Sequence, residues 1–453
     1  MEFAGKKVLV IGTGKSGISA AKLLDKKCEV VLHDSNEKLN KEDVLAKLPA
    51  DYRGKISTGA LTEDEIKETD IAVISPGVPI DCADVNNLRN AGAVISGEIE
   101  TGYLFSKGRL VAITGTNGKT TTTTLVGEIM KKISDSVFVV GNIGIPYTDN
   151  CELTNEKSIT VAEISSFQLE TADKFHPNVS AILNITPDHL NRHHTMEKYI
   201  EMKESICKNQ TLDDVIVLNY EDQYLREFGE KVTNTKVAWF SSARELEEGY
   251  YLDGKDIVYK HEGVKKVLVN VDELNIIGKH NYENVMAACA MAVAMEVPFD
   301  KLHEALTEFV AVEHRIEYTC TKKGVKYYND SKGTNPDAAI QAIRAMQSPT
   351  YLIGGGYDKG SEFDEWINAF DGKVKKLVLI GVTAKKIAET CDRLGFKDYV
   401  FMDTFEEAVN YCAEHAVSGE NVLLSPACAS WDMFKSYEER GRIFKELARK
   451  LPD

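Results

Sequence analysis

Residues 111–124 read VAITGTNGKTTTTT, an apolar strand that runs into a glycine-rich turn and then into Lys119 and Thr120. This order predicts a loop whose backbone amides surround phosphate groups, with Lys119 at the terminal phosphates and the Thr120 hydroxyl facing a magnesium ion. The stretch departs from the pattern G-x-x-x-x-G-K-S/T, because Ile113 stands where the first glycine is expected. We therefore predict a variant P-loop that binds ATP or GTP; the alternative interpretation is a threonine-rich helix start.

Short apolar runs alternate with segments of helical periodicity on both sides of this loop. Such alternation predicts parallel α/β structure, with ligands at the carboxyl ends of strands that are covered on both faces. A patch at 232–275 is different, since short runs separated by polar turns favour an antiparallel insertion or edge. The run MAACAMAVAM at 286–295 is too short to span a bilayer and predicts a buried helix. The strand candidates are 7–12, 70–77, 109–115, 158–165, 179–186, 213–219, 350–356, 376–381 and 421–426.

Composition limits the classes of partner and compartment. A chain of 453 residues has the length of about three domains. The formal net charge of -16 argues against a nucleic-acid partner, because no basic surplus is present to neutralise phosphates. Nine cysteines without a C-x-x-C pair favour a reducing compartment, and the N-terminal apolar stretch is too short for a signal peptide. We expect a cytoplasmic protein without membrane insertion.

A second glycine loop lies near the N-terminus, in VLVIGTGKSGISA at 8–20. Gly12, Gly14 and Gly17 match G-x-G-x-x-G after a strand, and Asp34 follows where a ribose-binding acid is expected, so a dinucleotide site is one interpretation. Only about a hundred residues precede the P-loop, which is half of a complete dinucleotide fold. We therefore predict a half-Rossmann unit for one mononucleotide, its diphosphate over the amides of Gly14 to Gly17 and its crevice walled by Ser75–Pro79. A purely structural glycine turn is the alternative.

Acidic and imidazole groups follow the next strands beside the P-loop. Glu163 ends one apolar strand, where a carboxylate would reach a metal ion, and Asp188 and His189 follow the next strand. Taken singly, each has an ordinary interpretation: Glu163 as a helix-capping acid, His189 as a surface histidine, and 193–194 as a solvated turn. Their shared position at strand ends beside one P-loop favours metal ligands.

Nine motifs together resemble the Mur ligase family, ATP-dependent amino-acid ligases that build the peptidoglycan stem peptide. Within the family, SSFQLE, SPACASWD and the short N-terminal domain resemble the branch that adds D-glutamate to UDP-N-acetylmuramoyl-L-alanine. The DNPR stretch of the diaminopimelate-adding enzymes is absent. The motifs are TGTNGKTTT at 114–122, GNIG at 141–144, EISSFQLE at 163–170, NITPDHLNRH at 184–193, GKHNYENVMAA at 278–288, EHR at 313–315, NDSKGTNPDA at 329–338, GGGYDKG at 354–360 and SPACASWDMF at 425–434.

The resemblance implies three α/β domains and a reaction. A half-Rossmann-like domain at 1–109 would bind UDP, a P-loop sheet at 110–311 would bind ATP, and a Rossmann-like domain at 312–453 would bind the amino acid. The implied reaction forms an acyl phosphate from ATP and the substrate carboxylate, which the amine of D-glutamate then displaces, with two Mg²⁺ ions. The implied partners are these small molecules alone, and we expect a monomer.

The resemblance also assigns roles to individual residues. Lys119, Glu163, His189 and Lys203 would be catalytic, and Thr120, Glu163, His189 and carbamylated Lys203 would hold the metal ions. The ATP-binding residues would be Gly115, Thr116, Asn117, Gly118, Lys119, Thr120, Thr121, Asn281, Asn284, Arg315 and Asp330. The sugar nucleotide would meet Gly14, Lys15, Ser16, Gly17, Asp34, Ser35, Gly77 and Asn142, and D-glutamate would meet Thr334, Lys359, Ser430 and Tyr437. Taken alone, Lys203 has the pattern of an exposed helix lysine.

Three alternatives stay open at this point. A related ligase could add a different amino acid, and an NAD-dependent oxidoreductase could use the first glycine loop, in which case Lys119 would be dispensable. A non-catalytic nucleotide-binding regulator is a further class. The presence of Lys119, Glu163, His189 and Lys203 together argues against the regulator.

Overall fold

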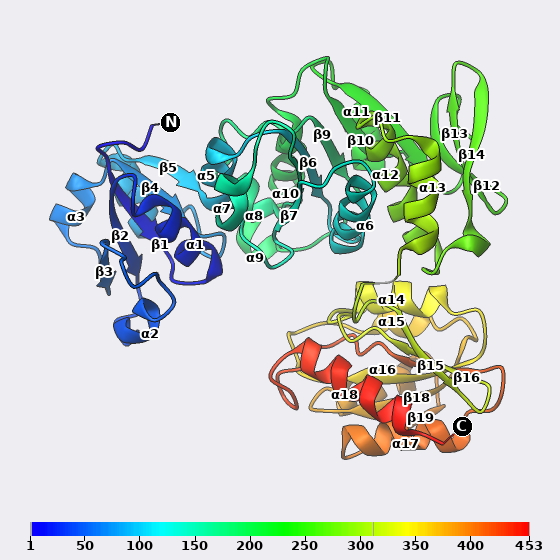
Figure 1. Ribbon diagram of the computed structural model, residues 1–453. Helices are drawn as coiled ribbons and strands as arrows, with labels where there is room; N and C mark the ends of the chain where they lie inside the picture. Colours follow the sequence, from blue (N-terminus) through cyan, green and yellow to red (C-terminus); the bar gives the residue numbers. More distant parts are fainter. Residues whose placement is uncertain (1, 311, 453) are drawn as a thin grey trace. The chain divides into compact units, whose positions relative to one another are not determined.

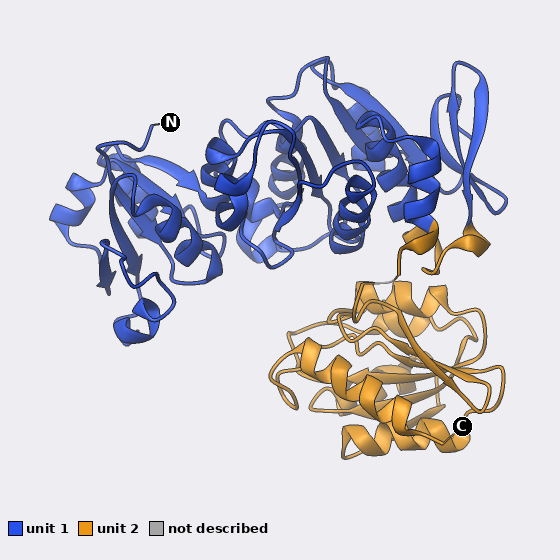
Figure 2. Ribbon diagram, viewed as in Figure 1, with its two compact units in different colours: residues 1–270, 283–306 blue, residues 271–282, 307–453 orange. Residues whose placement is uncertain are grey.

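The computed structural model describes residues 2–310 and 312–452, and its strands form three sheets in chain order (Figure 1). This confirms the predicted α/β class with three sheet-forming parts. By compactness the chain forms two units, residues 1–270 with 283–306, and 271–282 with 307–453 (Figure 2). The predicted boundaries at 109 and 311 stay predictions. Within the described ranges, no helix combines the length and apolar character that crossing a membrane requires.

The first sheet is parallel throughout, in the order β3-β2-β1-β4-β5. Val8 and Val10 of β1 pack with helix α1 on one face, whereas Leu9 and Ile11 pack with helix α4 on the other. The strand order reverses between β1 and β4, so the carboxyl ends of these two strands flank a crevice. The elements are β1 Lys7–Ile11, α1 Lys15–Leu24, β2 Glu29–Asp34, α2 Lys41–Leu45, β3 Lys55–Thr58, α3 Glu63–Glu68, β4 Ile71–Ile74, α4 Ala83–Asn90, β5 Val94–Gly97 and α5 Glu98–Phe105.

The second sheet has the order β14-β13-β12-β11-β10-β9-β6-β8-β7, with the P-loop strand β6 between β9 and β8. The predicted helix at 286–295 is confirmed inside α12, where residues 285–289 are completely buried. The strands are β6 Arg109–Thr114, β7 Val137–Gly141, β8 Ile159–Glu163, β9 Val179–Ile182, β10 Val215–Asn219, β11 Lys236–Ser241, β12 Gly249–Asp253, β13 Asp256–His261 and β14 Val264–Asn270. The helices are α6 Lys119–Lys131, α7 Tyr147–Asn150, α8 Ser166–Leu169, α9 Leu190–His193, α10 Met196–Glu204, α11 Gln223–Gly229, α12 Lys279–Ala294 and α13 Phe299–Glu308, with 3-10 turns at Cys151–Leu153, Ser205–Cys207 and Val271–Glu273.

The predicted antiparallel patch at 232–275 is partly wrong. β12, β13 and β14 are antiparallel, as expected. β11, however, pairs in parallel with β10, and β12 pairs in parallel with β11. The reason is the connection between β10 and β11, because a crossover through helix α11 returns the chain in the same direction.

The third sheet has the order β15-β16-β20-β17-β18-β19, in which only the β15–β16 pair is antiparallel. Its carboxyl edge therefore collects the loops that follow β16, β17, β18 and β20. The strands are β15 Glu317–Lys322, β16 Val325–Asn329, β17 Thr350–Gly355, β18 Val374–Ile380, β19 Tyr399–Phe401 and β20 Asn421–Leu424, and the helices are α14 Pro336–Ala345, α15 Asp364–Asn368, α16 Ala384–Leu394, α17 Phe405–His415 and α18 Tyr437–Lys450.

Helix α5 joins the first sheet to the second through two buried carboxylates. Glu98 Oε1 accepts hydrogen bonds from the backbone N–H and the hydroxyl of Thr148, both at 2.8 Å. Burial raises the pKa of Glu98 to about 7, although the bonds from Thr148 oppose this rise. The Glu100 carboxylate accepts the three successive backbone N–H groups of residues 173–175 at 2.8–3.0 Å. Helix α5, which follows the first sheet, is thus hydrogen-bonded to segments beside the second sheet.

Candidate active site

The N-terminal glycine loop connects β1 to α1, and its three glycines have different roles. Gly12 has a φ of +102°, and a Cβ on Gly17 would lie 1.8 Å from the Gly12 carbonyl oxygen, so both positions need glycine for close packing. A Cβ on Gly14 would meet no atom within 4 Å. The face of the loop at Gly14 is therefore open to a ligand.

Asp34, at the end of β2, accepts hydrogen bonds from this loop. Its Oδ2 accepts bonds from the Thr13 N–H at 3.2 Å and the Thr13 hydroxyl at 2.6 Å. Burial alone would raise the pKa of Asp34, but the bonds from Thr13 and Asn36 together lower it. Lys15, Ser35 and Gly77 are exposed and Ser16 is half-buried, all near the carboxyl ends of β1, β2 and β4.

The P-loop has the shape predicted for phosphate binding. Gly118 precedes α6 with a φ of +85°, and Gly115 has a φ of +149°, so the chain turns in conformations that favour glycine. A Cβ on Gly118 would lie 2.3 Å from Oδ1 of Asn284, which places this α12 side chain against the loop. Lys119 Nζ donates to the carbonyl oxygens of Gly115 and Thr116, both at 2.9 Å. The loop thus presents the N-terminus of a 13-residue helix to an anion.

Lys203, from helix α10, reaches the same carbonyl oxygen. It is only 2% exposed, and its Nζ donates to Gly115 O at 2.8 Å. Burial lowers the pKa of Lys203 well below its ordinary value; the positive charge of Lys119 lowers it further, whereas Asp188 raises it. The interpretation of Lys203 as an exposed helix lysine is therefore wrong, because the P-loop, distant in sequence, covers it.

Glu163 ends β8 beside the P-loop strand, where it is 2% exposed. Its Oε1 accepts a bond from Asn142 Nδ2 at 2.8 Å, and its Oε2 is buried without a hydrogen-bond partner among the described residues. A buried carboxylate oxygen without a donor is costly unless a cation compensates it, so the site fits a magnesium ion. Thr120, 8% exposed, lies in the first turn of α6, which follows the carboxyl end of β6. Across the two described ranges, no group of three His, Cys, Asp or Glu side chains is arranged to hold a metal ion.

The loop after β9 carries His189 in the left-handed conformation, with a φ of +53°. Its imidazole lies 3.4 Å from the Asp188 carboxylate and 4.8 Å from the Phe167 ring, centre to centre. His193 is buried, and its Nε2 lies 2.9 Å from the Ser166 hydroxyl, so only His194 of the predicted solvated turn is exposed. Burial lowers the pKa of His193 to about 4, which keeps its imidazole neutral.

Two residues that support the P-loop escaped the sequence analysis. Asn184 accepts from the Asn117 N–H at 2.8 Å and donates to the Asn117 carbonyl oxygen at 3.0 Å. The Tyr199 hydroxyl lies 3.0 Å from the Thr116 hydroxyl. Asn184 follows β9 at the same sheet edge as Glu163, and this position was a usable signal. Tyr199 lies on helix α10, and nothing in the sequence of this helix indicates a contact with the P-loop.

The other unit contains the remaining predicted nucleotide residues. Asp330 is 3% exposed after β16, and its carboxylate accepts from the Ser425 hydroxyl at 2.7 Å and from the Ile316 N–H at 3.3 Å. Burial raises the pKa of Asp330 to about 7, against the opposing effects of Ser425 and Arg315. Arg315 Nε is buried without a hydrogen-bond partner in the described chain. The first turn of α12 in this unit includes Asn281, which donates to Ile277 O at 2.8 Å.

The predicted amino-acid residues lie at the carboxyl edge of the third sheet. Ser430 is buried after β20, and Lys359 Nζ after β17 lies 4.8 Å from the Trp431 ring centre. Thr334 is half-buried in the loop after β16, and Tyr437 begins α18 with its ring 5.6 Å from Lys332 Nζ. The structure thus brings these side chains to loops of one sheet edge.

A buried arginine that the sequence analysis missed holds two of these loops. Arg440 of α18 is 1% exposed and donates to the carbonyl oxygen of Ser331 at 2.8 Å and to that of Cys428 at 3.2 Å. Its Nε also donates to the Ser331 hydroxyl at 2.9 Å. One guanidinium therefore links the loop after β16 to the loop after β20.

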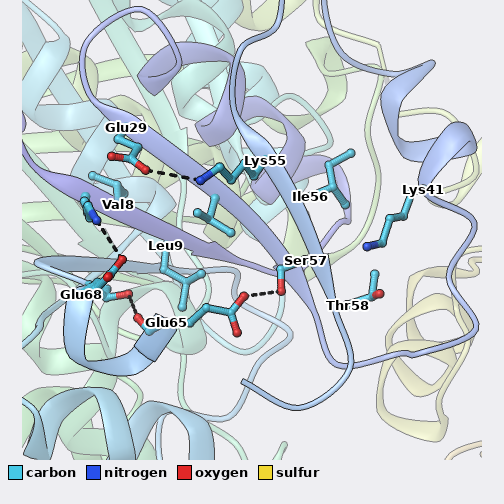
Figure 3. A pocket seen from close by; sticks show the side chains of 13 residues that line it. Val8, Leu9, Glu29, Lys41, Lys55, Ile56, Ser57, Thr58, Glu65 and Glu68 are labelled. Atoms are coloured by element: carbon cyan, nitrogen blue, oxygen red, sulfur yellow. Dashed lines mark hydrogen bonds and ion pairs between the residues drawn. The ribbon is translucent and has the colours of Figure 1, made fainter. Parts of the chain in front are cut away.

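A cavity of about 370 Å³ lies elsewhere, on one face of the first sheet (Figure 3). Leu9, Val31 and Ile56 contribute apolar surface, while ion pairs such as Lys55 with Glu29 line it. None of the predicted site residues lines this cavity. This cavity is therefore separate from the loops that carry the predicted site residues.

Comparison with known proteins shows which family the chain resembles. Three family models match: Mur ligase MurD-like, N-terminal domain, at residues 6–97; Mur ligase middle domain at 113–292; and Mur ligase, glutamate ligase domain, at 314–428. The chain is 60% identical to the UDP-N-acetylmuramoylalanine–D-glutamate ligase of Lachnoclostridium phytofermentans and 56% identical to that of Lachnospira eligens, each over 100% of both chains.

Solved structures agree in fold. The UDP-N-acetylmuramate-alanine ligase MurC of Thermotoga maritima superposes with a TM-score of 0.60 at 21% identity, over 98% of this chain and 99% of that one. At this identity the likeness concerns the fold alone. With full-length relatives at 56–60% identity and family models on all three parts, the chain belongs to the Mur ligase family.

Proposed function

We propose that this protein is an ATP-dependent ligase that joins D-glutamate to UDP-N-acetylmuramoyl-L-alanine, a cytoplasmic step of peptidoglycan synthesis. The 60% identity to a ligase of that name over the full chain supports the substrates. The observation that carries the chemistry is the arrangement at the P-loop. Lys119 and Lys203 both donate to the carbonyl oxygen of Gly115. Glu163 ends the neighbouring strand, and its Oε2 is buried without a hydrogen-bond partner among the described residues.

The reaction requires activation of a carboxylate, which is a poor acyl donor at neutral pH. The γ-phosphate of ATP is transferred to this carboxylate, and the amine of D-glutamate then attacks the acyl carbon and releases phosphate. Lys119 leaves its loop carbonyls to bind the β and γ phosphate oxygens, where it stabilises the charge of the transferring group. The loop amides of residues 115–121 hold the rest of the triphosphate. Asn281 and Asn284 would meet the adenine, Arg315 the phosphates and Asp330 the ribose.

Thr120, Glu163, His189 and carbamylated Lys203 are the residues that would hold Mg²⁺. When bound, the ions would supply positive charge that offsets the negative charge of the phosphate and carboxylate oxygens. Carbamylation of Lys203 joins the neutral amine to CO₂ with loss of one proton, and burial favours that neutral amine. Asn142 orients Glu163 through its hydrogen bond and faces the muramoyl group.

The substrates occupy the two remaining edges. Gly14, Lys15, Ser16 and Gly17 bind the diphosphate, while Asp34, Ser35 and Gly77 lie at the uridine. Thr334, Lys359, Ser430 and Tyr437 bind D-glutamate, whose two carboxylates need a cation such as Lys359. We propose that the enzyme acts as a monomer.

The test is phosphate release from ATP and Mg²⁺ in the presence of UDP-N-acetylmuramoyl-L-alanine. Parallel reactions contain D-glutamate, L-glutamate, L-lysine, meso-diaminopimelate or no amino acid. We expect release with D-glutamate alone. Phosphate release with a different amino acid would mean that the enzyme is a ligase with a different amino-acid substrate. No phosphate release with any of them would contradict the proposal.

The glycine loop offers a matched pair of substitutions. Gly14→Ala adds a Cβ into open space at a backbone conformation that alanine adopts, so we expect unchanged thermal stability. The KM for the sugar nucleotide should rise about tenfold or more, because the Cβ occupies the approach of the diphosphate. Gly17→Ala instead forces its Cβ against Gly12 O and should lower the stability by about 2–4 kcal/mol. Steady-state kinetics would measure the change in KM, and calorimetry would measure the change in stability. An unchanged KM in Gly14→Ala would mean that the diphosphate binds elsewhere.

A further inference from the structure

A nearly buried side chain connects the segment after β4 to the segment after β9. We call residues 75–79 the nucleotide loop and residues 184–193 the catalytic loop. Arg192 of the catalytic loop donates from its terminal nitrogen to the carbonyl oxygen of Val78 in the nucleotide loop, at 2.8 Å. The two loops belong to different sheets of the same compact unit.

The Arg192 guanidinium is also held by a carboxylate. Its terminal nitrogen and its Nε donate to the two carboxylate oxygens of Glu170, at 2.5 and 3.3 Å. Both side chains are nearly buried, at 11% and 5% exposure. A two-point bond between a planar guanidinium and a carboxylate fixes orientation as well as distance. Arg192 is therefore a fixed link and not a mobile surface charge.

The link continues to the expected catalytic histidine. The guanidinium carbon of Arg192 lies 5.0 Å from the centre of the Phe167 ring, and the His189 ring packs on that ring at 4.8 Å. A contiguous series of contacts thus runs from Val78 through Arg192 and Phe167 to His189. A narrow cavity lies beside it, and Val78, Phe167 and Arg192 are among the residues that line it.

We propose that Arg192 is a positioning residue that transmits sugar-nucleotide binding from the nucleotide loop to His189. The proposal rests on the proposed function, in which the nucleotide loop meets uridine and His189 acts near the reacting carboxylate. Because binding energy of a remote substrate part can be used to orient the reacting groups, breaking this link should lower kcat more than it raises KM. Arg192 itself contacts no reacting atom in this scheme.

The experiment compares Arg192→Met and Arg192→Lys with wild type in the full enzyme. Methionine keeps an unbranched side chain over Phe167 but has no donor, and we expect kcat to fall about 10- to 100-fold. The KM for ATP and the Kd for UDP should each change less than about threefold. The lysine ammonium can donate to Glu170 or to Val78, but it lacks the planar guanidinium geometry that serves both at once. Arg192→Lys should therefore recover only part of the wild-type kcat.

His194→Ala is the matched control. Its imidazole contacts Asp81 at 3.1 Å near the same two loops, but both side chains are more than half exposed. Such exposed pairs contribute little, so we expect kcat to change less than about twofold.

Three outcomes would overturn the inference. In Arg192→Met, a raised KM for the sugar nucleotide with unchanged kcat would make Arg192 a simple binding residue. A lower melting temperature with unchanged kcat per folded molecule would make it purely structural. If kcat, KM and melting temperature were all unchanged, Arg192 would not transmit binding to His189. If wild type itself releases no phosphate with any amino acid, the proposed function fails and this inference falls with it.

Discussion

Lys119→Ala should lower kcat about 1,000-fold or more while the protein stays folded. The Lys119 ammonium is the P-loop cation at the N-terminus of α6, and charge stabilisation at the transferring phosphate is the main catalytic contribution in such sites. The substitution also removes the positive charge that lowers the pKa of Lys203, so Lys203 should hold its proton more strongly. Phosphate release with D-glutamate measures the loss.

Lys131→Ala is the control, because Lys131 ends the same helix in an exposed pair with Glu128. It should retain wild-type kcat and melting temperature. Near-normal activity in Lys119→Ala would contradict the P-loop mechanism. It would also restore the oxidoreductase interpretation of the first glycine loop, which NAD binding would then test.

Lys203→Met should lower kcat about 100- to 1,000-fold without lowering the stability. Methionine fills a similar buried volume and removes an amine whose charged form is disfavoured there, so the melting temperature should stay constant or rise. In wild type, removal of dissolved CO₂ should reduce activity and bicarbonate should restore it, because the carbamate is lost and formed again. The variant should not respond to bicarbonate. Full activity in Lys203→Met, or a wild type that is indifferent to CO₂, would contradict the carbamate.

The strands and the P-loop could be predicted because their signals are local. A continuous apolar run such as 109–114, followed by glycine and Gly-Lys-Thr, specifies strand, turn and helix within a dozen residues. The carboxyl-edge rule predicts Glu163 and His189 after strands beside the P-loop strand, and β8 and β9 both pair with β6.

The burial of Lys203 could not be predicted from local pattern. Its helix α10 has an ordinary mixture of charged and apolar residues, and the residue that covers Lys203 is Gly115, 88 positions earlier. Arg192 and Arg440 are similar cases, since each donates hydrogen bonds to backbone carbonyl oxygens that other segments of the chain supply. The parallel pairing of β11 likewise depends on a partner strand that the run at 237–240 does not encode.

The carboxylates of α5 have a consequence for the modular use of this fold. Suppose that the sugar-nucleotide part were exchanged for that of another ligase by joining the two chains at residue 109. The foreign helix would then have to supply Glu98 for Thr148 and Glu100 for the three N–H groups of residues 173–175. A chimaera joined before Gly97 keeps these bonds intact. Residues 1–96 are thus the part to exchange in such a chimaera, with α5 kept on the second sheet. The exchanged part would also have to keep a hydroxyl at Ser19 for Asp149 and a carbonyl oxygen at Val78 for Arg192.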